Sequence, residues 1–202
     1  MTLLYNLVIF LARHLISLVA AFDPKTKLFV TGRHHLFEKL TSSFENNKFP
    51  VIWIHCASLG EFEQGRPVIE KLKREYPHYK ILLSFFSPSG YEVKKNYSYA
   101  DWMTYLPWDT EINAKRFIEI TKPCLALFVK YEFWHNYSSQ LKAKNVPLLS
   151  ISCIFRENQI YFTSYGSFFR NTLKNFSHFF VQNSESKKLL ESIGIKEITL
   201  TG

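Results

Sequence analysis

Short apolar runs alternate with amphipathic stretches through the last three quarters of this 202-residue chain. The runs predict strands at Val51–His55, Lys80–Phe86, Trp102–Leu106, Cys124–Val129, Pro147–Cys153, Phe176–Val181 and Glu197–Leu200. The stretches between them predict helices at Pro67–Tyr76 (with Pro67 in the first turn), Ser89–Tyr97, Glu111–Thr121, Trp134–Asn145 and Ser184–Ile193. Because strand–helix alternation produces parallel sheets covered on both faces, the sequence predicts an α/β, Rossmann-like domain over residues 51–202.

The amino-terminal segment, residues 1–24, predicts a membrane-associated helix. Leu3–Phe22 is about as long as a bilayer core is thick if helical, but Arg13 lies in its middle. Thr2, Asn6, Arg13 and Ser17 form a narrow polar stripe on an otherwise apolar helix. We favour a helix that lies in the membrane interface, and a true span or a buried core helix remain alternatives. Residues 25–50 are expected to form a connecting helix and a linker, with a polar connection over residues 41–49.

The net charge of +8 and the isoelectric point near 9.3 favour an anionic partner. Lys25, Lys27, Arg33 and Lys39 follow the first helix and predict attraction to an anionic membrane surface, the alternative being an ordinary solvated face. Nucleic acid is not expected as a partner, because the positive residues are dispersed and no recognition motif accompanies them. The three cysteines have neither metal-ligand spacing nor an even count, which fits a reducing cytoplasmic setting.

Four loops are predicted at the carboxyl edge of the sheet, where open α/β sheets bind ligands. They show no dinucleotide fingerprint, phosphate-binding loop or histidine-rich metal motif, so no metal is expected. The polar residues they carry suit hydroxyl and phosphate groups; they are Ser58, Glu61, Ser87, Ser89, Asp109, Lys130 and Glu132.

Two carboxylates in these loops are candidates for chemistry. Glu61 lies near a predicted helix start, where the helix dipole favours the charged form and hence a proton acceptor. Its alternatives are a capping glutamate and simple exposure. Glu132 follows another strand and precedes Trp134, and its alternative is a salt bridge with Lys130.

The motifs in these loops resemble those of the 3-deoxy-D-manno-octulosonic acid (Kdo) transferases. His55–Glu61 matches the family's H-x-x-S-x-G-E, and Ser87–Gly90 matches T-P-T-G. Leu106–Asp109 matches L-P-x-D, Glu132–Asn136 matches E-L-W-P-N, and Gln182–Glu185 matches a Q-x-x-E segment. Five ordered matches, spread over nearly the whole chain, are far more specific than any one of them.

The resemblance implies the amino-terminal, acceptor-binding half of a GT-B glycosyltransferase at the cytoplasmic face of the inner membrane. Glu61 would be the general base that activates a hydroxyl of the lipid A precursor, and Kdo would come from CMP-Kdo with inversion and without a metal or other cofactor. The substrate-binding residues implied are Ser58, Gly60, Ser89, Gly90, Asp109, Lys130, Glu132 and Asn136. The alternative is a non-catalytic basic α/β module that binds an anionic lipid or phosphorylated ligand at the membrane surface.

Two departures from the family qualify this expectation. The family commonly has a glutamate where this chain has Lys130, and a charge reversal cannot keep the same electrostatic role. Either Glu132 takes part of that role, or Lys130 neutralises a phosphate or the Kdo carboxylate. The family's donor-binding residues have no counterpart in these 202 residues, so we expect a carboxyl-terminal donor domain to be missing and the chain alone to be inactive. The oligomeric state is not predicted.

Overall fold

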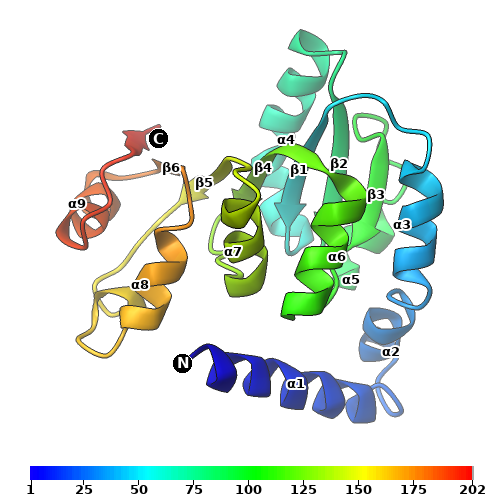
Figure 1. The fold of residues 1–202 in the computed structure, drawn as a ribbon, viewed down its shortest axis with the longest axis horizontal. Helices are drawn as coiled ribbons and strands as arrows, with labels where there is room; N and C mark the ends of the chain where they lie inside the picture. The colour runs from blue at the N-terminus through cyan, green and yellow to red at the C-terminus, as the bar shows by residue number, and fades with distance from the viewer. Residues whose placement is uncertain (202) are drawn as a thin grey trace.

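The computed structural model describes residues 1–201, in which seven parallel strands form one sheet. The strand order is β3-β2-β1-β4-β5-β6-β7, and every neighbouring pair is parallel. The strands are β1 (Val51–Cys56), β2 (Lys80–Phe85), β3 (Trp102–Tyr105), β4 (Pro123–Val129), β5 (Leu148–Cys153), β6 (His178–Val181) and β7 (Ile198–Leu200). The prediction of a Rossmann-like α/β fold is therefore confirmed (Figure 1).

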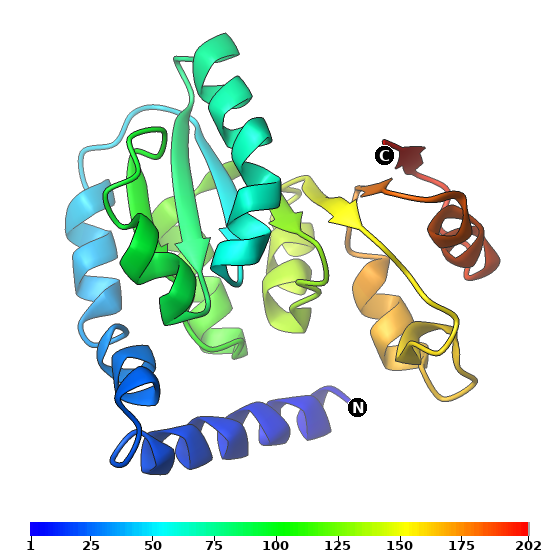
Figure 2. The same ribbon diagram turned by 180° about the vertical axis from the view of Figure 1, so that it is seen from behind.

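Helices cover both faces of the sheet (Figures 1 and 2). One apolar cluster joins the α4 residues Phe62 and Ile69 to one face of β1, β2 and β4. The other cluster packs α3, α6, α7, α8 and α9 against the opposite face. The helices are α1 (Thr2–Val19), α2 (Pro24–Thr31), α3 (Leu36–Phe44), α4 (Leu59–Glu75), α5 (Pro88–Lys94), α6 (Glu111–Thr121), α7 (His135–Ala143), α8 (Ser167–Leu173) and α9 (Ser184–Ser192), with a 3-10 turn η1 (Ile160–Phe162).

The start of α4 corrects one prediction. Pro67 was expected in the first turn of a helix, but it lies inside α4, which begins eight residues earlier at Leu59. Ser58 and Glu61 form a capping box that starts the helix directly after β1. The interior proline removes one backbone hydrogen bond, but burial of Phe62 and Ile69 holds the two halves of the helix on the sheet.

The segment between α1 and β1 is more ordered than predicted. It forms α2 and α3, and α3 extends to Phe44, within the stretch predicted as a polar connection. The reason is burial: Leu36, Leu40 and Phe44 all lie in the core, and the Phe44 ring packs 4.3 Å from that of Trp102.

The amino-terminal helix α1 lies across the carboxyl edge of the sheet, below α6 and α7 in Figure 1. It has the length and composition to cross a membrane, and none of its residues is buried in the structure. Its large side chains are exposed on the side away from the domain, among them Leu3, Leu11 and Leu18. The opposite side meets the domain: the Tyr5 hydroxyl donates to Asp109 Oδ2 at 2.6 Å.

Candidate functional site

The candidate site lies where the strand order reverses. The chain runs outward from β1 to β2 and β3, and then returns to place β4 on the other side of β1. In open α/β sheets this switch point leaves a crevice at the carboxyl ends of the two central strands, where ligands bind. Ser58, Gly60 and Glu61 follow β1, and Glu132 follows β4. The two predicted carboxylates therefore lie on the two sides of the switch point.

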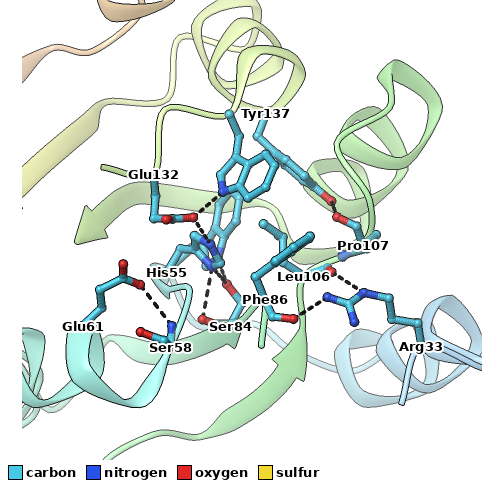
Figure 3. A network of polar contacts seen from close by, with 12 residues as sticks. Arg33, His55, Ser58, Glu61, Ser84, Phe86, Leu106, Pro107, Glu132 and Tyr137 are labelled. Carbon is cyan, nitrogen blue, oxygen red and sulfur yellow. Dashed lines mark hydrogen bonds and ion pairs between the residues drawn. The ribbon is translucent and has the colours of Figure 1, made fainter. Parts of the chain in front are cut away.

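Glu61 lies in the first turn of α4 with its carboxylate only partly covered. The Ser58 backbone N–H donates to its Oε2 at 3.0 Å, as Figure 3 shows. Burial raises the pKa of Glu61 and the charge of Glu132 raises it further, whereas His55 and the Ser58 amide oppose the rise. Glu61 is thus a helix cap whose pKa lies above the ordinary value of glutamate.

Glu132 is held by two aromatic side chains. Trp134 Nε1 donates to Glu132 Oε2 at 2.6 Å, and His55 Nε2 lies 3.2 Å from the same oxygen (Figure 3). Its partners in the structure are these two groups rather than Lys130, the partner considered from the sequence. Glu132 therefore has a fixed position from which its charge acts on Glu61.

A buried polar chain continues from Glu132 into the sheet. His55 Nδ1 lies 2.9 Å from Ser84 Oγ, and Trp53 Nε1 donates to that oxygen at 2.8 Å. His55 and Ser84 are fully buried. Since a carboxylate oxygen accepts hydrogen bonds, this contact suits the His55 tautomer that carries a proton on Nε2. The sequence reasoning did not select His55 or Ser84, although a histidine inside an apolar strand just before Ser58 and Glu61 was a usable signal.

Lys130 forms the turn that brings Glu132 back toward His55. Its φ of 64° lies in the left-handed region, and its backbone is tied to β5 by a hydrogen bond from Lys130 N–H to Ile151 O at 2.8 Å. Left-handed backbone is costly for a residue with a side chain. The residue at this position thus sets the direction of the loop as well as contributing charge.

Ser89 and Gly90 lie at the start of α5, beside the loop that follows β1. The Ser87 backbone N–H donates to Ala57 O at 2.7 Å, which joins the two loops. Ser87 caps α5 and Ser89 is exposed. A Cβ on Gly90 would meet the Phe85 ring at 2.2 Å, so this glycine lets α5 sit directly on β2.

Asp109 and Asn136 lie deeper, between α1, α6 and α7. Asp109 accepts from the backbone N–H groups of Asn136 and Tyr137 at the start of α7, at 3.1 and 3.0 Å, and also from Tyr5. Asn136 Nδ2 donates to Asp109 O and to Asn6 Oδ1. Burial raises the pKa of Asp109 to about 6, against the lowering effect of these donors. These two residues join α1 and α7 to the loop after β3.

Arg33 requires a correction. It was grouped with Lys25, Lys27 and Lys39 as a source of attraction to an anionic membrane surface or, alternatively, as part of a solvated face. Its guanidinium is instead largely enclosed and donates to the carbonyl oxygens of Phe86 and Leu106 at 2.7 and 2.9 Å (Figure 3) and to that of Phe29 at 2.7 Å. It also stacks over the Phe29 ring at 3.8 Å. The carbonyls at the ends of β2 and β3 have no strand partner beyond them, and Arg33 satisfies them. Arg33 therefore fastens the α2–α3 segment to the carboxyl edge of the sheet.

Together these positions describe a site suited to hydroxyl activation. A partly covered carboxylate with a raised pKa, Glu61, lies near a second, fixed carboxylate, Glu132, and the two follow the carboxyl ends of the central strands β1 and β4. A carboxylate of raised pKa is a better proton acceptor at neutral pH than an ordinary one. Within residues 1–201 no three His, Cys, Asp or Glu side chains are grouped as metal ligands are.

Comparison with known proteins identifies related sequences. Residues 33–202 match the family model described as 3-deoxy-D-manno-octulosonic-acid transferase (kdotransferase). The chain is 31% identical over 153 residues to a 3-deoxy-D-manno-octulosonic acid transferase of Aquifex aeolicus. The matched segment covers 75% of this chain and 39% of that protein. It is 35% identical over 99 residues to the protein of the same name from Haemophilus influenzae, covering 48% of this chain and 23% of that protein. The chain thus spans two fifths or less of these relatives.

Solved structures show the same fold at low sequence identity. UDP-GlcNAc 2-epimerase from Neisseria meningitidis, bound to UDP-GlcNAc, superposes with a TM-score of 0.55 at 18% identity, over 76% of this chain and 46% of that one. Another UDP-N-acetylglucosamine 2-epimerase structure superposes with a TM-score of 0.58 at 13% identity, over 77% of this chain and 48% of that one. In both, this chain matches about half of the neighbour, as expected for one half of a GT-B fold.

Proposed function

The chain belongs to the 3-deoxy-D-manno-octulosonic-acid (Kdo) transferase family, and from this premise we propose that it forms the acceptor-binding part of a glycosyltransferase of lipopolysaccharide biosynthesis. The proposed reaction transfers Kdo from CMP-Kdo to a lipid A precursor at the cytoplasmic face of the inner membrane. The observation that supports it best is Glu61, a partly covered carboxylate of raised pKa at the switch point of the sheet.

In this proposal Glu61 accepts the proton of an acceptor hydroxyl. The hydroxyl oxygen then attacks the anomeric carbon of Kdo, the bond from that carbon to the CMP phosphate breaks, and CMP leaves with the bonding electron pair. Attack from the side opposite to CMP inverts the anomeric configuration. Glu132, held by His55 and Trp134, raises the proton affinity of Glu61 from its fixed position.

The remaining loop residues serve acceptor binding in this proposal. Ser58, Gly60 and Ser89 are accessible or partly accessible at the crevice, with hydroxyls and a free backbone surface that suit a sugar. Lys130 supplies a positive charge for a phosphate or for the Kdo carboxylate. Gly90, Asp109 and Asn136 contribute by shaping the loops that carry the site, since their own groups are occupied by protein contacts.

The test is Kdo transfer by the full-length natural gene product carrying Glu61→Gln, with CMP-Kdo and a lipid A precursor as substrates. Loss of a general base should lower kcat by about 10² to 10⁴-fold with a smaller change in KM. Glu63→Gln is the matched control, because Glu63 lies on the same helix but points outward, with ion pairs to Arg66 and Lys94. Unchanged transfer by a folded Glu61→Gln protein would remove the general-base assignment, whereas absence of transfer by the parent protein would favour the non-catalytic module.

A further inference from the structure

A cavity of about 480 Å³ separates α1 from the body of the domain. Its walls come from α1, from the α2–α3 segment, from the loop after β3 and from α6. Among the side chains that line it are Arg13, Arg33, His34, Trp108, Asn113 and Arg116. Ligand pockets of proteins have volumes of roughly 300 to 1,000 Å³, so the cavity is large enough for a small ligand.

The lining is cationic and lacks a compensating charge. No carboxylate is present among the lining residues, and within residues 1–201 none forms an ion pair with Arg13, Arg33 or Arg116. The arginines on α4 differ, since Arg66 and Arg74 are each paired with a glutamate of their own helix. Three guanidinium groups around one cavity thus have no anion in the protein.

Arg33 is the deepest of the three. Its guanidinium binds three carbonyl oxygens, which leaves it charged and without a counter-ion. Burial lowers its pKa to about 9, which reflects the cost of enclosing the charge. An anion in the cavity would offset this cost. Arg116 is positioned from the α6 side, with its guanidinium 4.5 Å from the centre of the Phe37 ring.

The location of the cavity indicates where the anion comes from. The polar side of α1 contributes Arg13 and Ser17 to the lining, while Leu3, Leu11 and Leu18 on its other side are more than half exposed. An amphipathic helix of this kind lies with its apolar side about 5–10 Å into the membrane, at the boundary of headgroups and acyl chains. The cavity, on the opposite side of the same helix, would then lie at the level of the lipid phosphates.

We propose that this cavity binds a phosphate monoester group, carried by the headgroup of an anionic membrane lipid. Guanidinium groups bind phosphate through paired, charge-assisted hydrogen bonds, and the cavity provides three of them together with the Asn113 amide. The site is separate from the catalytic crevice. Ser58, Glu61 and Glu132 do not line it, and the contacting rings of Phe86, Trp108 and Trp134 stand between the two. The proposal therefore goes beyond the glycosyltransferase function.

The experiment is calorimetric titration of the full chain with water-soluble dihexanoyl phosphatidic acid, inorganic phosphate and dihexanoyl phosphatidylcholine. Arg13→Gln and Arg116→Gln should each weaken binding of the phosphatidic acid by about ten-fold, the usual effect of losing a charge-assisted hydrogen bond. Lys25→Gln is the matched control, because Lys25 is exposed on α2 beside α1 but does not line the cavity. It should leave the affinity within about two-fold. Arg13 and Arg116 are both exposed, so their variants should keep the parental thermal midpoint.

The two phosphate probes separate the source of the anion. Tighter binding of the phosphatidic acid than of inorganic phosphate supports a lipid headgroup, whereas equal affinities with the same arginine dependence support a free phosphate ion in the same site. Two results overturn the proposal. One is the absence of binding by both phosphate probes, and the other is an equal loss of affinity in Lys25→Gln, which would indicate general attraction by the positive surface.

Discussion

At the scale of single residues, two neighbours act on the pKa of Glu61 in opposite directions. Glu132 raises it and His55 lowers it. If Glu61 is the general base that we propose, activity falls as the pH drops through this pKa, because a base works only when deprotonated. We expect Glu132→Gln to move the acidic limb of the kcat/KM profile to lower pH, and His55→Gln to move it to higher pH. The measurement is the pH dependence of Kdo transfer by the full-length natural gene product.

The control for this pair is Glu63→Gln, which removes a carboxylate from the outer side of the same helix. Glu63 is not among the main causes of the shift at Glu61, so the limb should stay in place. If Glu132→Gln and His55→Gln moved the acidic limb of the kcat/KM profile in the same direction, the electrostatic explanation would be contradicted. Such a result would indicate a structural change common to both variants.

Asp109 gives a second prediction, for stability rather than activity. Its pKa is raised from 3.8 to about 6 by burial, so the folded state binds the proton more tightly than the unfolded state. The resulting stabilisation is fully present below about pH 4 and is lost as the pH rises through about 6, and the shift corresponds to about 3 kcal/mol. We expect the free energy of unfolding to decline over this interval in the parent protein, relative to Asp109→Asn.

Urea unfolding of both proteins at intervals from pH 4 to 7 measures this difference. Asp101 provides the contrasting control, because Lys73, Lys80 and the Ile81 amide lower its pKa. Relative to Asp101→Asn, the parent should change little from pH 7 to about pH 4 and lose stability only at lower pH, as Asp101 becomes protonated. A pH-independent difference between the parent and Asp109→Asn would show that Asp109 is already ionised at pH 4.

The candidate residues show what a sequence reveals at this scale. Glu61 and Glu132 were found because each follows an apolar strand, and that placement depends only on local pattern. His55 was overlooked since its partners, Ser84 and Glu132, are 29 and 77 residues away in the chain. A side chain whose role depends on such long-range contacts resembles any other residue of a buried strand.

At the scale of helices and strands, two glycines of α4 separate packing from surface effects. A Cβ at Gly65 would lie 3.0 Å from Val129 Cγ2 and 3.5 Å from Cys56 Sγ, at the contact between α4 and the two central strands. We expect Gly65→Ala to destabilise the protein by about 1–3 kcal/mol through overpacking. A Cβ at Gly60 would meet nothing within 4 Å, so Gly60→Ala should stabilise the helix by about 0.5–1 kcal/mol.

Thermal unfolding of both variants measures these changes in stability. A second measurement is the KM for the acceptor in Kdo transfer by the corresponding full-length proteins. Gly60 borders the crevice, so a more stable Gly60→Ala protein with a raised KM for the acceptor would support close approach of the sugar to this turn. Equal stabilities of the two variants would contradict the packing of α4 described here.

The elements themselves were largely predictable, and the exceptions have physical causes. Each strand is a compact apolar run, and α6 begins and ends where its pattern predicted. The start of α4 was misplaced because Pro67 is a strong local signal, whereas the capping box of Ser58 and Glu61 is visible only as a pair. The short helix α8 was not predicted, since its seven residues carry too little periodicity to distinguish it from a loop.

At the scale of the whole molecule, α1 and the loops that carry Glu61 and Glu132 lie at the same, carboxyl edge of the sheet. The strands point their carboxyl ends toward α1, and Tyr5, Asn6 and Asn136 connect this helix to the start of α7 (Figure 1). The polar stripe foreseen on α1 thus faces the domain, while the apolar side faces outward. A lipid-borne sugar entering from a membrane below α1 would meet the carboxyl edge of the sheet directly. The amphipathic pattern of α1 was predictable from the sequence, but only the fold shows that its polar stripe packs on the domain.

If α1 associates with a membrane as we propose, the depth of its side chains shows whether it lies in the membrane plane or crosses it. Leu3, Leu11 and Leu18 lie along one side of the helix and are 87%, 57% and 69% exposed. For a helix docked flat against the domain, tryptophans placed at these three positions should be quenched by brominated lipids at one shallow depth, about 5–10 Å below the headgroups. For a helix that spans the roughly 30 Å core, Leu11→Trp would lie near the bilayer centre and the other two near its surfaces.

Tyr165→Trp, on an exposed loop beyond η1, is the control and should escape quenching. We expect the flat arrangement, because crossing the bilayer would break the contacts of Tyr5 and Asn6 with the domain and bring the unpaired Arg13 into hydrocarbon.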